Sequence, residues 1–193
     1  MNKIETNNII LLEGFNIVGK SEYIDKQLPH YYDLYNNSYF CKTISDITKS
    51  PKWIADGEVI DIVEKLISGS NKSNLMNLNL IINQGIFSDY VNSRIFNNKN
   101  LDTKILDLYK NNSFFKDYIS HIYIRHHDIN TAQFIYESAK LNELIPVFRT
   151  FEDYWKMYSY ANLLFKEVYD YIGIKPLIFE TMTDMTWSES NDF

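Results

Sequence analysis

A glycine-rich stretch near the N-terminus carries the clearest chemical pattern in the chain. Residues 14–21 read Gly-Phe-Asn-Ile-Val-Gly-Lys-Ser and match the spacing G-x-x-x-x-G-K-[ST]. In loops of this pattern, backbone N–H groups and the start of the following helix hold a polyphosphate, the lysine reaches its β- and γ-phosphates, and the hydroxyl binds Mg²⁺. The sequence therefore predicts a nucleotide-binding loop, with Ser21 also on the metal. Its members are Gly14, Phe15, Asn16, Ile17, Val18, Gly19, Lys20 and Ser21.

The segments on either side of this loop fit that interpretation. Residues 9–12 (Ile-Ile-Leu-Leu) form a short apolar run typical of a buried strand, and residues 21–28 are expected to form a helix. A phosphate-binding loop needs a strand before it and a helix after it. The alternative interpretation is a glycine turn beside a surface lysine, in which Lys20 would do no chemistry.

The composition limits the classes of function. The 193 residues suit one domain, and 45% hydrophobic residues are enough for a full core. A net charge of −6 argues against a broad nucleic-acid interface, which usually needs a basic face. Cys41 is the only cysteine, so no internal disulfide can form. The first six residues lack the apolar core of a signal peptide and no apolar run has the length of a membrane helix, so we expect a cytoplasmic protein without a membrane span.

Strand-like and helix-like segments alternate along the chain, which is typical of an α/β fold. We expect a single domain, residues 1–193, with a five-stranded parallel sheet covered by helices on both faces. The expected strands are 9–12, 30–35, 78–82, 121–124 and 176–180. The expected helices are 21–28, 56–67, 86–96, 101–118, 128–140 and 151–171, the last of them stopped by Gly173. We expect residues 36–50 to be irregular and residues 188–193 to be frayed.

Two arginines are candidates for contacts with a second, phosphate-accepting substrate. Arg125 stands at the carboxyl end of an expected strand, where ligands of open α/β sheets bind, and it begins the cluster Arg125-His126-His127-Asp128. The alternative is a polar strand end and a helix cap, with Asn130 or Asp128 as the candidate cap. A metal site is disfavoured in this cluster because adjacent histidines rarely aim at one ion. Arg94 either faces the acceptor pocket or makes an ion pair at the surface or between helices.

Other classes of phosphate-loop protein need motifs that this chain lacks. A switch GTPase reads its base with Asn-Lys-x-Asp, and residues 71–74 (Asn-Lys-Ser-Asn) fall one residue short of that motif and precede a strand. A motor-type ATPase ends a strand with an acid, whereas the strand expected at 78–82 is followed by Asn83. A loop so close to the start of a short chain favours a small-molecule kinase.

The chain resembles the thymidylate kinase and deoxynucleoside kinase superfamily over most of its length. The resemblance is carried by residues 12–14 (Leu-Glu-Gly) leading into 19–21 (Gly-Lys-Ser), and by residues 83–90 (Asn-Gln-Gly-Ile-Phe-Ser-Asp-Tyr). A strand followed by Asp128 and a helix, and residues 151–154 (Phe-Glu-Asp-Tyr) opening a long helix, complete it. The resemblance implies a three-layer P-loop nucleotide kinase fold with ATP and Mg²⁺ as cofactors. It also implies a structural role for the residue that precedes the loop, Glu13.

The resemblance further implies roles for side chains on the acceptor side. The family usually has Asp/Glu-Arg where this chain has Asn83-Gln84, the acid helping to hold Mg²⁺ and the arginine binding the acceptor. Asp33 belongs to the second expected strand region, where the family places a carboxylate, and would activate the acceptor hydroxyl or hold Mg²⁺. Asp89 aligns with an acid that reads the base in some deoxynucleoside kinases. The expected substrate contacts are Asn83, Gln84, Asp89, Arg94 and Arg125.

The family also closes a mobile lid, with arginines, over the transferring phosphate. The matching region, residues 133–150, offers Lys140 and Arg149. The expected catalytic residues are therefore Lys20, Asp33 and Arg149. Members of the family often pair as homodimers, for which the apolar faces of the helices expected at 56–67 and 101–118 are candidates if they do not belong to the core.

Taken together, the sequence favours an ATP- and Mg²⁺-dependent phosphotransferase acting on a deoxynucleoside monophosphate. Deoxynucleoside phosphorylation is the nearest alternative, because a monophosphate needs cations and the chain has only three arginines. The amides Asn83 and Gln84 leave open a nucleotide-binding protein that regulates or assembles with partners instead of catalysing. Kinase action on a nucleic-acid 5′ end is a fourth alternative, disfavoured by the acidic balance.

Overall fold

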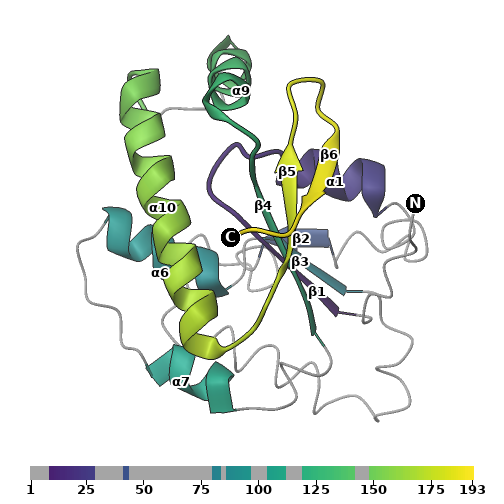
Figure 1. The fold of residues 1–193 in the computed structure, drawn as a ribbon, viewed down its shortest axis with the longest axis vertical. Coiled ribbons are helices and arrows are strands. Elements are labelled where there is room, and N and C mark those ends of the chain that lie inside the picture. Colours follow the sequence, from purple (N-terminus) through teal and green to yellow (C-terminus); the bar gives the residue numbers. More distant parts are fainter. Residues whose placement is uncertain are drawn as a thin grey trace.

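The computed structural model describes residues 9–28, 41–43, 80–83, 86–96, 104–111, 119–141 and 148–193 (Figure 1). In chain order its strands are β1 (Ile9–Glu13), β2 (Cys41–Thr43), β3 (Leu80–Asn83), β4 (Ile119–His126), β5 (Leu177–Thr181) and β6 (Trp187–Ser190). Its helices are α1 (Lys20–Gln27), α6 (Ile86–Phe96), α7 (Lys104–Asn111), α9 (Ile129–Leu141) and α10 (Phe151–Ile172). The chain is therefore a mixed α/β protein.

The strands form one mixed sheet in the order β2-β3-β1-β4-β5-β6. Neighbouring strands from β2 to β5 are parallel, whereas β6 runs antiparallel to β5. The expectation of a purely parallel sheet is therefore wrong, because β6 adds an antiparallel strand at one edge. Parallel strands share a direction, so β1, β3, β4 and β5 all end at the same side of the sheet, which we call the carboxyl edge.

The strand register fixes which residues meet at the carboxyl edge. Glu13, the last residue of β1, pairs with Tyr123 of β4. His126, the last residue of β4, pairs with Thr181 at the end of β5. The glycine-rich loop begins one residue after Glu13, so it leaves the sheet at this edge, beside the ends of β4 and β5.

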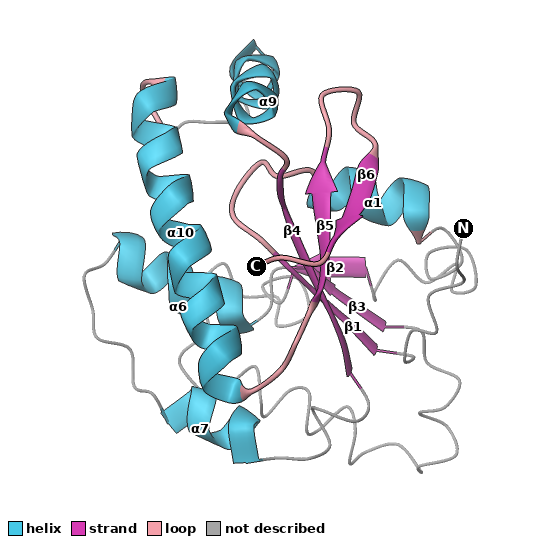
Figure 2. Ribbon diagram, in the orientation of Figure 1, coloured by secondary structure: helices cyan, strands magenta, loops and turns pink. Residues whose placement is uncertain are grey.

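Helices lie on both sides of the sheet (Figure 2). α1 lies on one side, and α6, α7 and α10 lie on the other, where α10 packs against α6, α7 and α9. This arrangement explains why β1 is a continuous apolar run: a strand covered on both faces needs apolar side chains on both. Accordingly, Ile10, Leu11 and Leu12 are all buried.

The longest helix, α10, begins and ends at the expected signals. The Thr150 Oγ1 accepts a hydrogen bond from the Asp153 N–H at 3.1 Å and caps the N-terminus. Gly173 adopts a left-handed φ of 69°, and its N–H donates to the Tyr169 carbonyl at 3.0 Å. The expected helix and its glycine stop are confirmed.

Most other expected elements are present with ends shifted by a few residues. The strands expected at 78–82, 121–124 and 176–180 are β3, β4 and β5. The helix expected at 128–140 is α9, and Asp128 caps it by accepting a hydrogen bond from the Thr131 N–H at 2.7 Å. The strand expected at 30–35 and the helix expected at 56–67 lie outside the described residues.

Three regions differ from the sequence-based expectation. β2 lies within residues 36–50, which the sequence predicts to be irregular. β6 includes the start of the segment predicted to fray, and the ring of Phe193 stacks on Tyr123 with centroids 5.0 Å apart. Residues 133–141 of the predicted lid belong to the regular helix α9, while residues 142–147 lie outside the described part of the chain.

Candidate functional site

The glycine-rich loop joins β1 to α1 at the carboxyl edge, and its geometry requires both glycines. Gly14 has a φ of 146°, and a Cβ there would lie 2.4 Å from the backbone oxygen of Ile124 in β4. Gly19 has a left-handed φ of 84° and stands immediately before the first residue of α1. A side chain at either position would strain the backbone or prevent the loop from lying against β4. The loop is therefore built around close backbone approach.

The carbonyl groups of the loop accept hydrogen bonds from side chains around it. The Lys20 Nζ donates to the Gly14 and Phe15 oxygens, both at 2.7 Å. Two further donors come from distant parts of the chain. Tyr154 of α10 donates to the Asn16 oxygen at 3.0 Å, and Thr181 of β5 donates to the Val18 oxygen at 2.7 Å. Two elements besides β1 and α1 thus fix the loop.

Lys20 is a buried cation. Only 7% of the residue is exposed, and burial lowers its pKa from 10.5 to about 8, although Glu13 and Glu22 act in the opposite direction. With a pKa near 8, the ammonium form still predominates at pH 7. Its hydrogen-bond partners among the described residues are neutral carbonyls, so in that part of the chain no acid contacts the ammonium directly. This makes Lys20 suited to an anionic ligand.

Ser21 follows Lys20 in the first turn of α1, and the residue is exposed. Within the described residues, no group of three or more His, Cys, Asp or Glu side chains could hold a metal ion. Mg²⁺ does not need such a cage, because it commonly binds through few protein ligands together with phosphate oxygens and water. The exposed hydroxyl beside Lys20 fits that mode of binding.

Glu13 links the start of the loop to α6. Its carboxylate is fully buried and accepts hydrogen bonds from the Phe87 and Ser88 N–H groups at 3.1 and 3.0 Å, and from the Ser88 hydroxyl. A carboxylate at a helix N-terminus satisfies free N–H groups and interacts favourably with the helix dipole. The expected structural role of Glu13 is confirmed.

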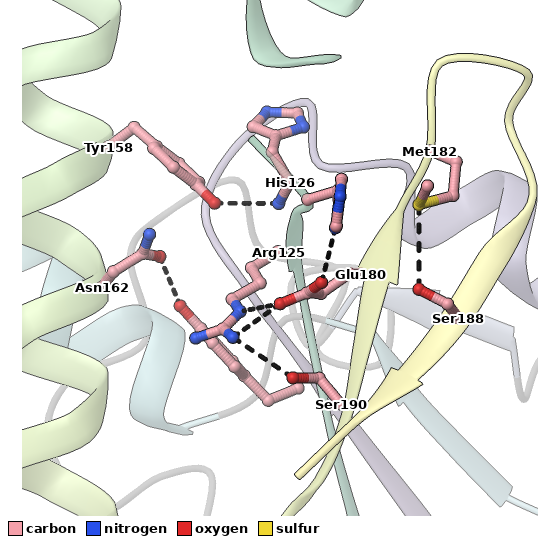
Figure 3. A network of polar contacts seen from close by, with 10 residues as sticks. Arg125, His126, Tyr158, Asn162, Glu180, Met182, Ser188 and Ser190 are labelled. Carbon is pink, nitrogen blue, oxygen red and sulfur yellow. Dashed lines mark hydrogen bonds and ion pairs between the residues drawn. The ribbon is translucent and has the colours of Figure 1, made fainter. Parts of the chain in front are cut away.

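Arg125 lies at the end of β4 as expected, but its guanidinium is already paired. Its Nη2 and Nε lie 2.6 and 3.1 Å from the Glu180 Oε1, and Nη2 is 3.4 Å from the Ser190 hydroxyl (Figure 3). His127 contacts the other Glu180 oxygen at 2.7 Å. Burial raises the pKa of Glu180, but hydrogen bonds from His127 and Arg125 outweigh it and leave the pKa below its usual value. The structure therefore favours the polar strand end over a free phosphate contact.

Arg94 is also engaged by neighbouring groups. It lies in the last turn of α6, where its Nη1 donates to the Tyr90 hydroxyl at 3.2 Å and is 3.9 Å from a carboxylate oxygen of Glu167 in α10. Of the two roles that the sequence leaves open for Arg94, the structure shows the ion pair between helices.

The remaining expected acceptor residues are spread over several elements. Asn83 ends β3 at the carboxyl edge, and its half-buried side chain has an Oδ1 without a hydrogen-bond partner in the described part of the chain. Asp89 lies in α6. Asp33 and Gln84 lie outside the described residues.

The two cations expected in the lid lie beside the segment 142–147. Lys140 is exposed near the end of α9, with its Nζ 5.9 Å from the centroid of the Tyr136 ring. Arg149 is exposed just before α10. No described contact brings either of them to Lys20.

The site also contains three residues to which the sequence analysis gave no role at the loop: His126, Tyr154 and Thr181. His126 is buried, and burial lowers its pKa from 6.5 to about 3, with Lys20 lowering it further and Asp128 opposing. Tyr154 and Thr181 contact the loop directly and His126 contacts Tyr154, although all three are far from the loop in sequence. No local motif signals such a contact.

Comparison with known proteins adds no assignment. No protein-family model matches the chain, and no curated protein sequence matches it. Among the helices described here, none combines the length and the apolar character needed to cross a bilayer.

Proposed function

We propose that the chain is an ATP- and Mg²⁺-dependent phosphotransferase with the fold of the P-loop nucleotide kinases, acting on a deoxynucleoside monophosphate. One observation carries the proposal. The carbonyl groups of the glycine-rich loop are bonded by surrounding side chains, and the hydrogen-bond partners of the buried Lys20 ammonium within the described residues are the neutral oxygens of Gly14 and Phe15.

The orientation of the loop peptides supports phosphate as the ligand. In a trans peptide the C=O and the following N–H point to opposite sides. Because the Asn16 and Val18 oxygens are held from outside the loop, the N–H groups of Ile17 and Gly19 point the other way. Neither N–H has a hydrogen-bond partner within the described residues. Backbone N–H groups arranged in this way next to a helix N-terminus form an anion-binding concavity.

The position of the loop in the sheet supports the same ligand. Ligands of open α/β sheets bind beyond the carboxyl ends of strands, where the direction of the chain through the sheet reverses. Here β1 is followed by β2 on one side of the sheet, whereas β3 is followed by β4 on the other side of β1. The loop after β1 lies at this reversal, which favours a ligand held between the ends of β1 and β3.

In the proposed reaction the chain supplies charge and position. Lys20 would neutralise the β- and γ-phosphates, the loop N–H groups would hold the same oxygens, and Ser21 would contribute a ligand to Mg²⁺. The metal, when bound, supplies further charge neutralisation. Phosphoryl transfer depends mainly on these two effects, because the transition state spreads charge over the phosphoryl oxygens.

A second candidate acceptor is an unphosphorylated deoxynucleoside. Arg94 and Arg125, the arginines expected to bind an acceptor phosphate, are both paired with carboxylates in the structure. A nucleoside hydroxyl needs no such cation. This observation favours the deoxynucleoside, while the resemblance to thymidylate kinases favours the monophosphate.

The test is a titration with Mg-ATP followed by an acceptor panel. A ligand that binds only the folded state adds about 2.7 kcal/mol of stability at a hundredfold excess over its Kd, so the melting temperature should rise with Mg-ATP. Deoxynucleosides, their monophosphates and 5′-hydroxyl oligonucleotides are then offered with labelled ATP, and transfer to a monophosphate is the expected result.

The outcomes separate the alternatives. Transfer to a nucleoside alone would establish the second candidate. Binding of ATP without transfer to any acceptor would indicate a nucleotide-dependent regulatory or assembly protein. A melting temperature and tryptophan emission unaffected by millimolar Mg-ATP would refute the proposed function itself.

A further inference from the structure

A buried histidine at the end of β4 lies directly behind the glycine-rich loop. Only 4% of His126 is exposed, and its ring packs against Tyr154 and Tyr158 of α10, with centroids 6.0 and 4.9 Å away. Its backbone N–H donates to the Tyr158 hydroxyl at 2.8 Å (Figure 3). Both the backbone and the ring of His126 are therefore held against the same helix.

The hydrogen bonds around Tyr154 define the direction of the proton. The Tyr154 hydroxyl lies 3.0 Å from the Asn16 oxygen and 2.7 Å from the His126 Nε2. A carbonyl oxygen can only accept, and a hydroxyl has one proton, so Tyr154 donates to Asn16. The second contact then requires His126 to donate its Nε2–H to the Tyr154 oxygen. His126 therefore donates to Tyr154, and Tyr154 donates to the Asn16 carbonyl oxygen, which accepts.

These donor and acceptor roles also fix the tautomer of the histidine. A neutral ring that carries its proton on Nε2 has a bare lone pair on Nδ1. The Nδ1 is buried and has no hydrogen-bond partner among the described residues, which agrees with an unprotonated nitrogen. The low pKa of His126, which comes from burial and the nearby Lys20, agrees with a neutral ring as well.

These two hydrogen bonds orient one peptide of the loop, the peptide that joins Asn16 to Ile17. Holding the Asn16 carbonyl sets the direction of the Ile17 N–H, since the two groups belong to the same peptide. Ile17 has a left-handed φ of 58°, which is costly for a β-branched residue and needs support from its surroundings. The Tyr154 hydroxyl supplies that support, because its only proton is directed to the Asn16 carbonyl oxygen.

We propose that His126, acting through Tyr154, is a positioning residue for the phosphate-binding loop: it donates to the tyrosine hydroxyl and thereby commits the hydroxyl proton to the Asn16 carbonyl. The Ile17 N–H is then presented to the ligand before the ligand arrives. The inference rests on the proposed function for the identity of the ligand, but the ordering of the loop is a property of the protein alone.

Four variants test this proposal. Tyr154→Phe removes the hydroxyl and keeps the ring, and His126→Phe removes the Nε2 donor. His126→Gln places an amide N–H where Nε2–H was and should preserve the donor. Tyr158→Phe is the matched control. It removes a buried hydroxyl one turn further along the same helix, and this hydroxyl contacts the His126 backbone and not the loop. Melting temperatures are recorded for all four variants.

The first measurement is hydrogen exchange of the loop amides without ligand, and the second is the affinity for Mg-ATP. Tyr154→Phe and His126→Phe should each raise the exchange rate of the Ile17 amide and weaken Mg-ATP binding about tenfold, the effect of losing one ordering hydrogen bond. In assays of transfer the KM for ATP should rise similarly, with kcat changing by less than about threefold. His126→Gln should stay near wild type, and Tyr158→Phe should lower the melting temperature without changing Mg-ATP affinity.

The double variant separates positioning from general packing. If the two side chains act in series, His126→Phe should have no further effect on affinity or exchange in the Tyr154→Phe background. Additive effects, or a His126→Gln variant as impaired as His126→Phe, would overturn the proposal. Should wild-type protein bind no Mg-ATP, the proposed function fails, and loop exchange in the four variants still decides for or against the positioning role.

Discussion

Lys20 and Arg125 lie at the same edge of one sheet, yet their charges meet different partners. Lys20 donates to the carbonyl oxygens of Gly14 and Phe15, which carry no net charge. Arg125 donates to the carboxylate of Glu180. Within the described residues no carboxylate contacts the first cation directly, whereas the second cation is paired with one. The presence of a basic residue at a strand end therefore does not by itself identify an anion site.

The contrast extends to the residues around each cation. On the loop side, neutral side chains hold two of the loop carbonyls: Tyr154 and Thr181 donate to the Asn16 and Val18 oxygens. On the Arg125 side the contacts join side chains that project from β4, β5 and β6. Hydrogen bonds from neutral side chains to backbone carbonyls order a loop without compensating any charge. In a pair of oppositely charged side chains, each charge compensates the other. The predictions below test this difference, starting with the change of largest effect.

The most damaging change on the loop side is Gly14→Ala. Its Cβ would lie 2.4 Å from the backbone oxygen of Ile124, and a central strand cannot move to make room. We expect the free energy of unfolding to fall by about 4 kcal/mol, in the range typical of severe backbone clashes. Urea unfolding measures it. Gly173→Ala is the control, because nothing lies within 4 Å of a Cβ there and only the left-handed φ opposes it, at a cost of about 1 kcal/mol. Equal losses in the two variants would contradict the close approach of the loop to β4.

Removing the Lys20 ammonium should weaken ligand binding more than it lowers the free energy of unfolding. Lys20→Ala should weaken Mg-ATP binding about a hundredfold, because hydrogen bonds to charged groups contribute roughly 1.5–3 kcal/mol each. Calorimetric titration measures the Kd. The control is Lys26→Ala, which removes an exposed lysine from the same helix and should change the Kd by less than about twofold. Similar losses in both variants would show that α1 attracts the nucleotide only through its general charge.

Acid should destabilise the loop side through His126. Burial lowers its pKa from 6.5 to about 3, with Lys20 as a further cause and Asp128 opposing, so the unfolded chain takes up a proton across a range in which the folded chain does not. Stability from this group is therefore complete above pH 6.5 and is lost as the pH falls toward 3, by about 1.4 kcal/mol per pH unit.

The measurement compares urea unfolding of wild type and His126→Gln between pH 6.5 and 4. Both proteins contain the same carboxylates, so the difference in slope isolates the histidine. Wild type should lose stability more steeply than the variant, and equal slopes would mean that the buried ring is not kept neutral.

The smallest expected effect lies on the Arg125 side. Glu180→Gln removes the compensating charge and should tighten binding of a deoxynucleoside monophosphate about threefold, while the affinity for the unphosphorylated nucleoside stays unchanged, since charge pairs near a surface contribute modestly. Competition against a fluorescent nucleotide measures both affinities. An equal change for both ligands would indicate that the Arg125 charge does not reach the acceptor.

Local patterns were sufficient for most of the fold and for the loop. The apolar run of β1, the glycine spacing and the Gly173 stop each depend on residues within one short window, which is why they could be predicted. β6 was not predicted, because an edge strand with partner strands on one side only needs no apolar run: in Trp187-Ser188-Glu189-Ser190 the two central side chains are exposed. β2 is only three residues long, too short to show a period.

The partners of the site residues were less accessible to sequence reasoning. The contact between Arg125 and Glu180 follows from the pairing of β4 with β5, where the two residues are direct neighbours, and this register is not visible in either segment alone. Tyr154 reaches Asn16 across 138 positions of the chain. Local geometry that depends on one residue type at one spacing could be predicted, and contacts that depend on several elements meeting could not.

The backbone of Ile17 has a consequence for the autonomy of the loop. An isoleucine at φ 58° occupies a conformation that costs an L-amino acid about 1–2 kcal/mol and that a free peptide would leave. Residues 9–28 prepared as a synthetic fragment would lack Tyr154 and Thr181 and should relax into other backbone conformations. Grafting residues 14–21 onto another scaffold would therefore not reproduce the loop conformation. The scaffold would also need a helix and a strand that hold the loop carbonyls as α10 and β5 do.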